Sequence, residues 1–132
     1  MNKLELDNLC HICYKEPNSH SFRKISEHNF YTCPAQASKY NDTEGILNHY
    51  RLYLEKHGPN PWIWIFDCKG FELKHMLDLK TAYGIVSLLN EKYGIHLKKI
   101  IIINPTWHIH SILAIISPFL NKEIQSLIEI LS

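Results

Sequence analysis

The segment that most constrains the fold runs from Leu97 to Leu120, where a β-branched apolar run is followed at once by an apolar helix. Four consecutive isoleucines, Ile100 to Ile103, predict a central strand that is covered on both faces. Pro105 ends this strand because proline has no N–H to donate to a sheet. Apolar residues then recur at mostly helical spacing from Thr106 to Ser117, and Pro118 ends the helix. A helix this apolar needs cover on more than one side, from the core, another chain or a bound apolar molecule.

The rest of the chain alternates predicted strands and helices. A first strand is expected at 30–35, an amphipathic helix at Thr43–His57, a second buried strand at Trp62–Phe66 and a helix from Leu79 to Tyr93. With residues 124–131 as a last strand or short helix, the order is β-α-β-α-β-α-β. Such alternation predicts an α/β fold, with a mostly parallel β-sheet and flanking helices.

Composition and charge limit the function. The 132 residues, 45% of them hydrophobic, are enough for one domain with a substantial core. A net charge of +1 gives no reason to expect a nucleic-acid partner. The sequence has no GxGxxG, GxxxxGK[ST] or GxSxG motif, and no nucleophile stands with a base, so we do not expect an enzyme. Four cysteines without a signal peptide favour a reducing, cytoplasmic location.

Residues 1–29 form a polar segment that contains cysteine and histidine, and we expect it to precede an α/β domain over 30–132. By residue type, Cys10, Cys13, His28 and Cys33 could hold a tetrahedral zinc ion. Their spacing matches no established zinc pattern, and we favour free thiols packed on the domain. We therefore expect no cofactor, with zinc as the alternative.

Two further polar features lie near the predicted strand ends. His108 and His110 form an HxH pair, but residues two apart on a helix diverge by about 200°. We therefore expect one solvated and one packed histidine rather than a metal or catalytic pair. Asp67 is expected to be a hydrogen-bond acceptor at the end of its strand.

Four pieces of the chain together resemble the CRAL-TRIO lipid-binding domain. They are WIWIFDCKG at 62–70, a tyrosine before L-K-K at 93–99, IIIINPTW at 100–107 and SPFLNKEIQSLIEIL at 117–131. The family pattern has an apolar strand ending in D-x-K-G, a tyrosine before L-K-x, a strand ending in I-I-N-x-P, and a helix leading to K-P-F-L. The resemblance extends over roughly Thr43 to Leu131.

The resemblance implies a lipid-binding domain that holds a phospholipid or an isoprenoid between the sheet and a gate helix. The strands would form the floor of an apolar pocket and the helix its cover, and the implied pocket and gate residues are Trp64, Phe66, Ile101, Ile103, Trp107, Ile109, Leu113, Ile116 and Phe119. A membrane surface is a further possible partner. The alternative is a protein-interaction module without bound lipid, which uses the apolar helix at 106–120.

Overall fold

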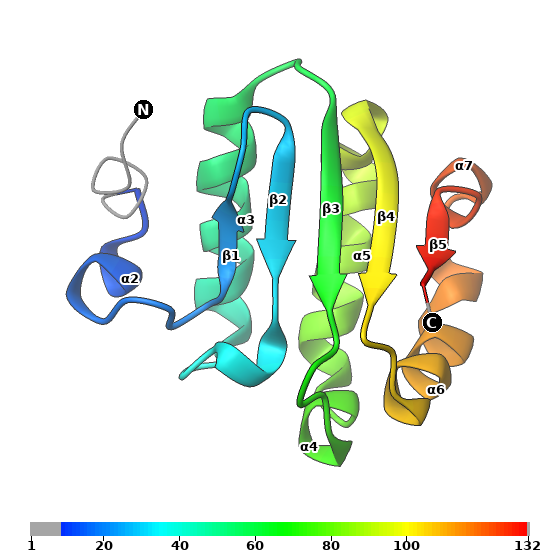
Figure 1. Cartoon of the computed structure of the whole chain (residues 1–132). Helices are drawn as coiled ribbons and strands as arrows, with labels where there is room; N and C mark the ends of the chain where they lie inside the picture. The colour runs from blue at the N-terminus through cyan, green and yellow to red at the C-terminus, as the bar shows by residue number, and fades with distance from the viewer. Residues whose placement is uncertain (1–8, 132) are drawn as a thin grey trace.

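One five-stranded β-sheet organises the structure, a computed structural model that describes residues 9–131 (Figure 1). The strands lie side by side in chain order: β1 (Phe22–Lys24), β2 (Asn29–Thr32), β3 (Trp62–Asp67), β4 (Leu97–Ile103) and β5 (Ile128–Ile130). β1 pairs antiparallel with β2, and the other three pairings are parallel. The predicted α/β fold with a mostly parallel sheet is confirmed.

Helices precede β1 and connect β2 to β3, β3 to β4 and β4 to β5. They are α2 (His11–Lys15), α3 (Thr43–His57), α4 (Leu73–Met76), α5 (Leu79–Glu91), α6 (Trp107–Ile116) and α7 (Lys122–Gln125), with 3-10 turns η1 (Pro34–Gln36), η2 (Tyr93–His96) and η3 (Ser117–Phe119). The last segment, predicted as a strand or a short helix, contains both, since α7 leads directly into β5.

The helix α3 shows why its boundaries were predictable. The Asp42 carboxylate accepts a hydrogen bond from the Gly45 N–H at 3.3 Å and caps the first turn. At the other end Gly58 has a φ of 70°, a conformation that glycine adopts without strain, and its N–H bonds to the carbonyls of the last turn.

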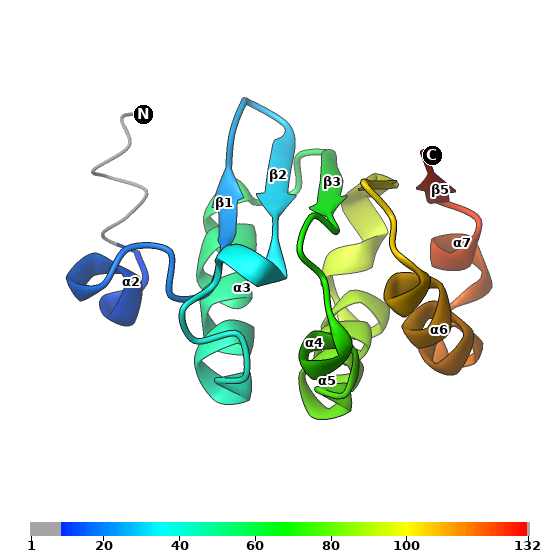
Figure 2. The same ribbon diagram turned by 60° about the horizontal axis from the view of Figure 1, so that its bottom comes forward.

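Within residues 9–131, helices cover one face of the sheet and not the other (Figure 2). In Figure 2, α3, α4, α5 and α6 all lie on the same side of the sheet. Ile100 and Ile102 point to that side and are only 6% and 2% exposed, whereas the alternate residues Ile101 and Ile103 are half-buried. The prediction of cover on both faces was therefore wrong in the described part of the chain: a run of isoleucines leaves no polar residue to mark the open face.

The N-terminal part of the chain contributes to the same sheet. β1 was not predicted, because three residues with two charges among them show no usable alternation. It adds an antiparallel edge strand in which Phe22 is fully buried. The expected boundary between residues 29 and 30 stays a prediction, and the portion of that segment at 1–8 lies outside the described residues.

Candidate functional site

A cavity of about 150 Å³ lies between the covered face of the sheet and the helices α3, α5 and α6. Its floor consists of alternate strand residues, Trp64 and Phe66 of β3 with Ile100 and Ile102 of β4. Hydrogen-bonded neighbours in the sheet hold them in two rows, Trp64 beside Ile100 and Phe66 beside Ile102. Because side chains alternate along a strand, each row presents its apolar side chains to the same cavity.

The helix α6 lines one side of the cavity. Ile109, Ile112, Leu113 and Ile116 line it at spacings of three and four, which is the inward stripe of a helix. Ile109 and Ile112 are both buried, so the cover is tight in its middle.

Five of the nine predicted pocket residues line this cavity: Trp64, Phe66, Ile109, Leu113 and Ile116. Ile101 and Ile103 do not, because they stand in register with Ile65 and Asp67 on the other face of the sheet. The prediction combined the two strands in the wrong relative register. Ile100 and Ile102, not Ile101 and Ile103, line the cavity beside Trp64 and Phe66. Nothing in a run of four isoleucines says which two point inward.

Trp107 and Phe119 also lie outside the cavity lining. They are 63% and 59% exposed, at the start of α6 and in η3. Ile115 of α6 is exposed as well. The helix is thus apolar on its inner and on its outer side, as its sequence suggests, but the two predicted aromatic gate residues belong to the outer side.

Hydrogen bonds fix both ends of α6 to the rest of the domain. Before the helix, the Asn104 side-chain amide donates to Asp67 Oδ1 at 2.9 Å, and the Thr106 hydroxyl donates to the Phe71 carbonyl at 3.3 Å. After it, the Asn90 amide of α5 donates to the Phe119 carbonyl at 2.7 Å. Polar contacts therefore fix the ends of α6, while apolar side chains pack beneath its middle.

Comparison with known proteins agrees with this arrangement. The family model described as the CRAL/TRIO domain matches residues 12–132. The chain belongs to this family. Domains of the family bind hydrophobic small molecules such as lipids.

The fold of this CRAL/TRIO domain is also found among solved structures. The crystal structure of Sfh5 superposes with a TM-score of 0.66 at 14% sequence identity, over 77% of this chain and 42% of that one. The chain thus spans less than half the length of that relative, and the likeness shows the fold alone. Among curated proteins none matches significantly. Within the described residues, no helix is long and apolar enough to cross a membrane.

The carboxyl end of β3 carries a buried acidic group in this CRAL/TRIO domain. Asp67, 7% exposed, accepts hydrogen bonds from the Tyr31 hydroxyl at 2.5 Å, the Asn104 amide at 2.9 Å and the Lys69 N–H at 2.9 Å. Burial alone would raise the pKa of Asp67, but these donors lower it below its ordinary value. The expected strand-end acceptor is confirmed, and its bond to Asn104 ties it to the start of α6.

A second hollow of about 470 Å³ lies at the opposite ends of the strands, beside Trp62 and His96. Its lining mixes apolar groups with Glu55 and Lys92, which pair with each other. In open α/β sheets ligands collect at the carboxyl ends of the strands, and this hollow lies at the amino ends. The smaller, apolar cavity is the better candidate for a hydrophobic ligand.

The predicted zinc set is only half assembled. Cys10 and Cys13 lie together, but His28 hydrogen-bonds to the Pro61 carbonyl at 3.0 Å, and Cys33 donates to the Lys69 carbonyl at 3.5 Å. The structure places His20 and His49 beside Cys10 and Cys13 instead. No alternating or helical pattern links these positions. The one available signal was His49, a histidine within the apolar stripe of a predicted helix.

The HxH pair does not converge. His110 is exposed. His108 is half-buried, and the centroid of its ring lies 3.8 Å from the centroid of the Trp107 ring. The expected arrangement, one solvated and one packed histidine, is the one observed. Over residues 9–131, the side chains that could together hold a metal ion are Cys10, Cys13, His20 and His49. His108 and His110 do not belong to this group.

Proposed function

We propose that this chain binds one hydrophobic ligand, a lipid or its acyl chain, in the apolar cavity beneath α6, and that α6 is the gate through which the ligand passes. The observation that supports this most is the position of the cavity, between a sheet floor and a helix that is apolar on both sides. The ligand would be held by burial, and the proposal requires no chemical step.

The size of the cavity supports a movement of α6 when the ligand binds. A void of about 150 Å³ accommodates a molecule of the size of benzene, and sites for larger ligands occupy roughly 300–1,000 Å³. A lipid chain therefore requires at least a doubling of the space. The floor is held by the hydrogen bonds between β3 and β4, whereas the middle of α6 is held by side-chain packing. Outward movement of α6 between its anchored ends therefore costs less free energy than separation of the two strands.

Burial supplies the binding free energy. Each methylene group that leaves water contributes about 0.8 kcal/mol, so a chain of several methylenes offsets the cost of separating α6 from the sheet. The packing that this opening disrupts is itself apolar, and the acyl chain takes the place of the side chains that move away.

The outer side of α6 suggests where the ligand enters. Trp107, Ile115 and Phe119 are exposed apolar side chains on α6 and η3. We propose that these side chains contact a membrane during exchange of the ligand. A protein-interaction module without bound lipid is the second candidate, because the same three side chains would equally suit a protein partner.

Replacement of Leu113 tests the gate. Leu113→Asp places a carboxylate on the inner side of α6, and we expect it to reduce binding of the fluorescent fatty acid cis-parinaric acid at least tenfold, since an unpaired buried charge is costly. Ala114→Asp, on the exposed side of the same helix, is the matched control and should bind normally. Unchanged binding by a folded Leu113→Asp variant would contradict the gate, and absence of binding by the wild-type protein would favour the interaction module.

A further inference from the structure

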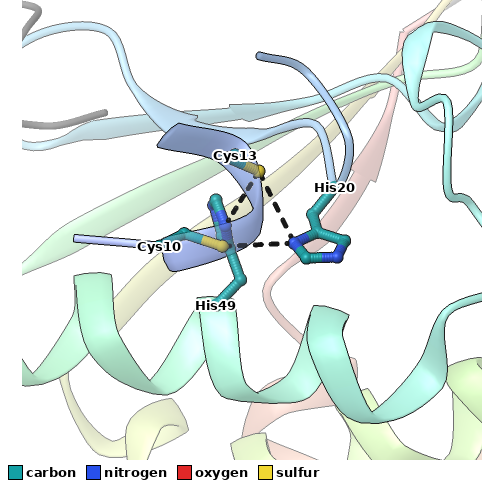
Figure 3. Close-up of side chains that lie close together, drawn as sticks. All are labelled: Cys10, Cys13, His20 and His49. Carbon is teal, nitrogen blue, oxygen red and sulfur yellow. Dashed lines mark hydrogen bonds between the residues drawn. The ribbon is translucent and has the colours of Figure 1, made fainter. Parts of the chain in front are cut away.

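Four side chains from three parts of the chain converge beside α3, and the lipid site does not account for them (Figure 3). Cys10 immediately precedes α2, Cys13 lies within it, His20 follows in the loop before β1, and His49 projects from α3. All four are 3–5% exposed. Their potential ligand atoms, two sulfurs and two nitrogens, all lie within 4.8 Å of one another.

The three sulfur–nitrogen distances that join these side chains are close to those of a tetrahedral metal site. Zn–S bonds of about 2.3 Å and Zn–N bonds of about 2.05 Å at the tetrahedral angle place sulfur and nitrogen about 3.6 Å apart. Cys10 Sγ lies 3.4 Å from His20 Nδ1, and Cys13 Sγ lies 3.5 Å from both His20 Nδ1 and His49 Nδ1. Three of the six pairs of ligand atoms therefore already lie close to the spacing of a tetrahedral site, and the other three lie within 4.8 Å.

The outer nitrogens of both imidazoles are occupied in the way that metal-binding histidines require. His20 Nε2 lies 2.9 Å from the Asp42 carboxylate, and His49 Nε2 lies 2.5 Å from the Phe22 carbonyl. Both partners are acceptors, so each Nε2 carries the proton and each Nδ1 directs its lone pair toward the sulfurs. Carboxylate and carbonyl acceptors of this kind orient the ring and raise its basicity toward a metal.

The surrounding backbone leaves room for this arrangement. A side chain at Gly45 would place its Cβ 2.0 Å from Asp42 Oδ2 and 2.8 Å from His20 Nε2. Glycine at this position is therefore needed for the Asp42–His20 contact. The backbone N–H groups of Ser19 and His20 also act to lower the pKa of the Cys13 thiol. Such donors stabilise a thiolate.

The two thiols share their charge unequally. A hydrogen bond from the Cys13 thiol favours the thiolate of Cys10 and lowers the pKa of Cys10. The same bond to Cys10, together with burial, raises the pKa of Cys13. Metal binding would displace the thiol protons of both residues, because cysteine binds a metal ion as a thiolate.

We propose that Cys10, Cys13, His20 and His49 form a structural zinc site. Two soft thiolates and two imidazoles in a tetrahedron are the ligands that select zinc, whereas calcium and magnesium prefer oxygen. The set is closed, because four protein ligands fill the coordination sphere and all four are buried. The ion would fasten α2 and the His20 loop to α3, and His20 also borders the cavity. The proposal does not depend on lipid binding.

Zinc content of the purified full chain tests the site. We would produce the protein without a polyhistidine tag in zinc-supplemented medium, dialyse it and measure metal by mass spectrometry against protein concentration. We expect about one zinc per chain in the wild type. Cys13→Ser and His49→Gln should contain far less. His28→Gln and Cys33→Ser remove residues of the same types outside the cluster and should keep their zinc.

Three results would overturn the proposal. The first is a folded wild-type protein with far less than one zinc per chain. The second is a Cys10–Cys13 disulfide, seen as a mass two hydrogens lower than that of the reduced chain. The third is zinc that is lost from the His28 or Cys33 variants and retained by the Cys13 variant.

Cobalt substitution keeps the test decisive if the cluster variants do not fold. Wild-type protein exchanged with Co²⁺ should show the visible bands of tetrahedral cobalt and a near-ultraviolet thiolate-to-cobalt band, and zinc should abolish both. Weak, octahedral-type bands without the thiolate band would contradict a site with two cysteines.

Discussion

Enlarging Ala82, which lines the cavity from α5, separates ligand binding from stability. Ala82→Leu adds apolar atoms to the cavity between the sheet and the helices. If the void is empty in the free protein, filling it stabilises the fold. If the same void receives the ligand, filling it also weakens binding. A variant that is more stable and yet binds the ligand less tightly is difficult to explain by general damage to the fold.

The expected size follows from the cavity volume. Cavities in protein cores cost about 24 cal/mol per Å³, so a leucine that fills half of the ~150 Å³ cavity recovers at most about 1.8 kcal/mol. In a domain of this length that corresponds to a rise in Tm of about 7 °C. Imperfect fit of the new side chain would reduce the gain.

Thermal unfolding by circular dichroism and titration with cis-parinaric acid measure the two effects. We expect a higher Tm and at least tenfold weaker binding for Ala82→Leu. Ala114→Leu makes the same change on the exposed side of α6 and should alter neither quantity much. A destabilised Ala82→Leu variant that binds the fatty acid like wild type would refute the assignment of this cavity as the ligand site.

Two further predictions concern buried titratable groups. Burial, with a contribution from nearby Lys74, lowers the pKa of His75, so below about pH 6.5 the unfolded chain takes up a proton that the folded chain resists. The free energy of unfolding should therefore fall as the pH decreases from 6.5. The urea unfolding midpoint of His75→Gln should depend less steeply on pH than that of the wild type. An identical pH dependence in the two proteins would exclude His75 as a cause. Asp67→Asn should lower the free energy of unfolding by about 1.5–3 kcal/mol at pH 7, because it removes a charged acceptor of three hydrogen bonds. Since the pKa of Asp67 is lowered in the fold, the difference should shrink as the pH falls below about 4, and a difference that persists there in urea titrations would contradict it.

Elements with strong local signals were predictable from the sequence. The helix expected at Thr43–His57 has those bounds in the structure, because an aspartate cap and a terminal glycine mark its ends. The strand expected at Trp62–Phe66 extends by a single residue, to Asp67. In both segments the local preference and the packing of the domain favour the same structure.

The pocket was only partly predictable because its floor depends on register. Ile101 and Ile103 are chemically identical to Ile100 and Ile102, and only the pairing with β3 decides which pair faces the helices. Likewise, Trp107 is as apolar as Ile109, and the angle at which α6 lies on the sheet decides which one points outward. Sequence composition alone holds no information about either choice.

The cysteine and histidine cluster shows a different limit. Cys10 and Cys13 are neighbours in sequence, but His20 lies in a loop with left-handed residues on either side, Asn18 and Ser21, and His49 is 36 residues beyond Cys13. Their meeting depends on how the N-terminal segment packs on α3. Long-range contacts of this kind follow from the tertiary fold, which is why residue type and spacing indicated His28 and Cys33 instead.

The most direct test of ligand binding is a native mass spectrum of the full chain after incubation with vesicles of mixed phospholipids and fatty acids, recorded beside its denatured mass. We predict an adduct of the mass of one lipid that disappears on denaturation, and that Leu113→Asp lacks while Ala114→Asp keeps it. A wild-type protein that remains free of lipid under these conditions would contradict the account.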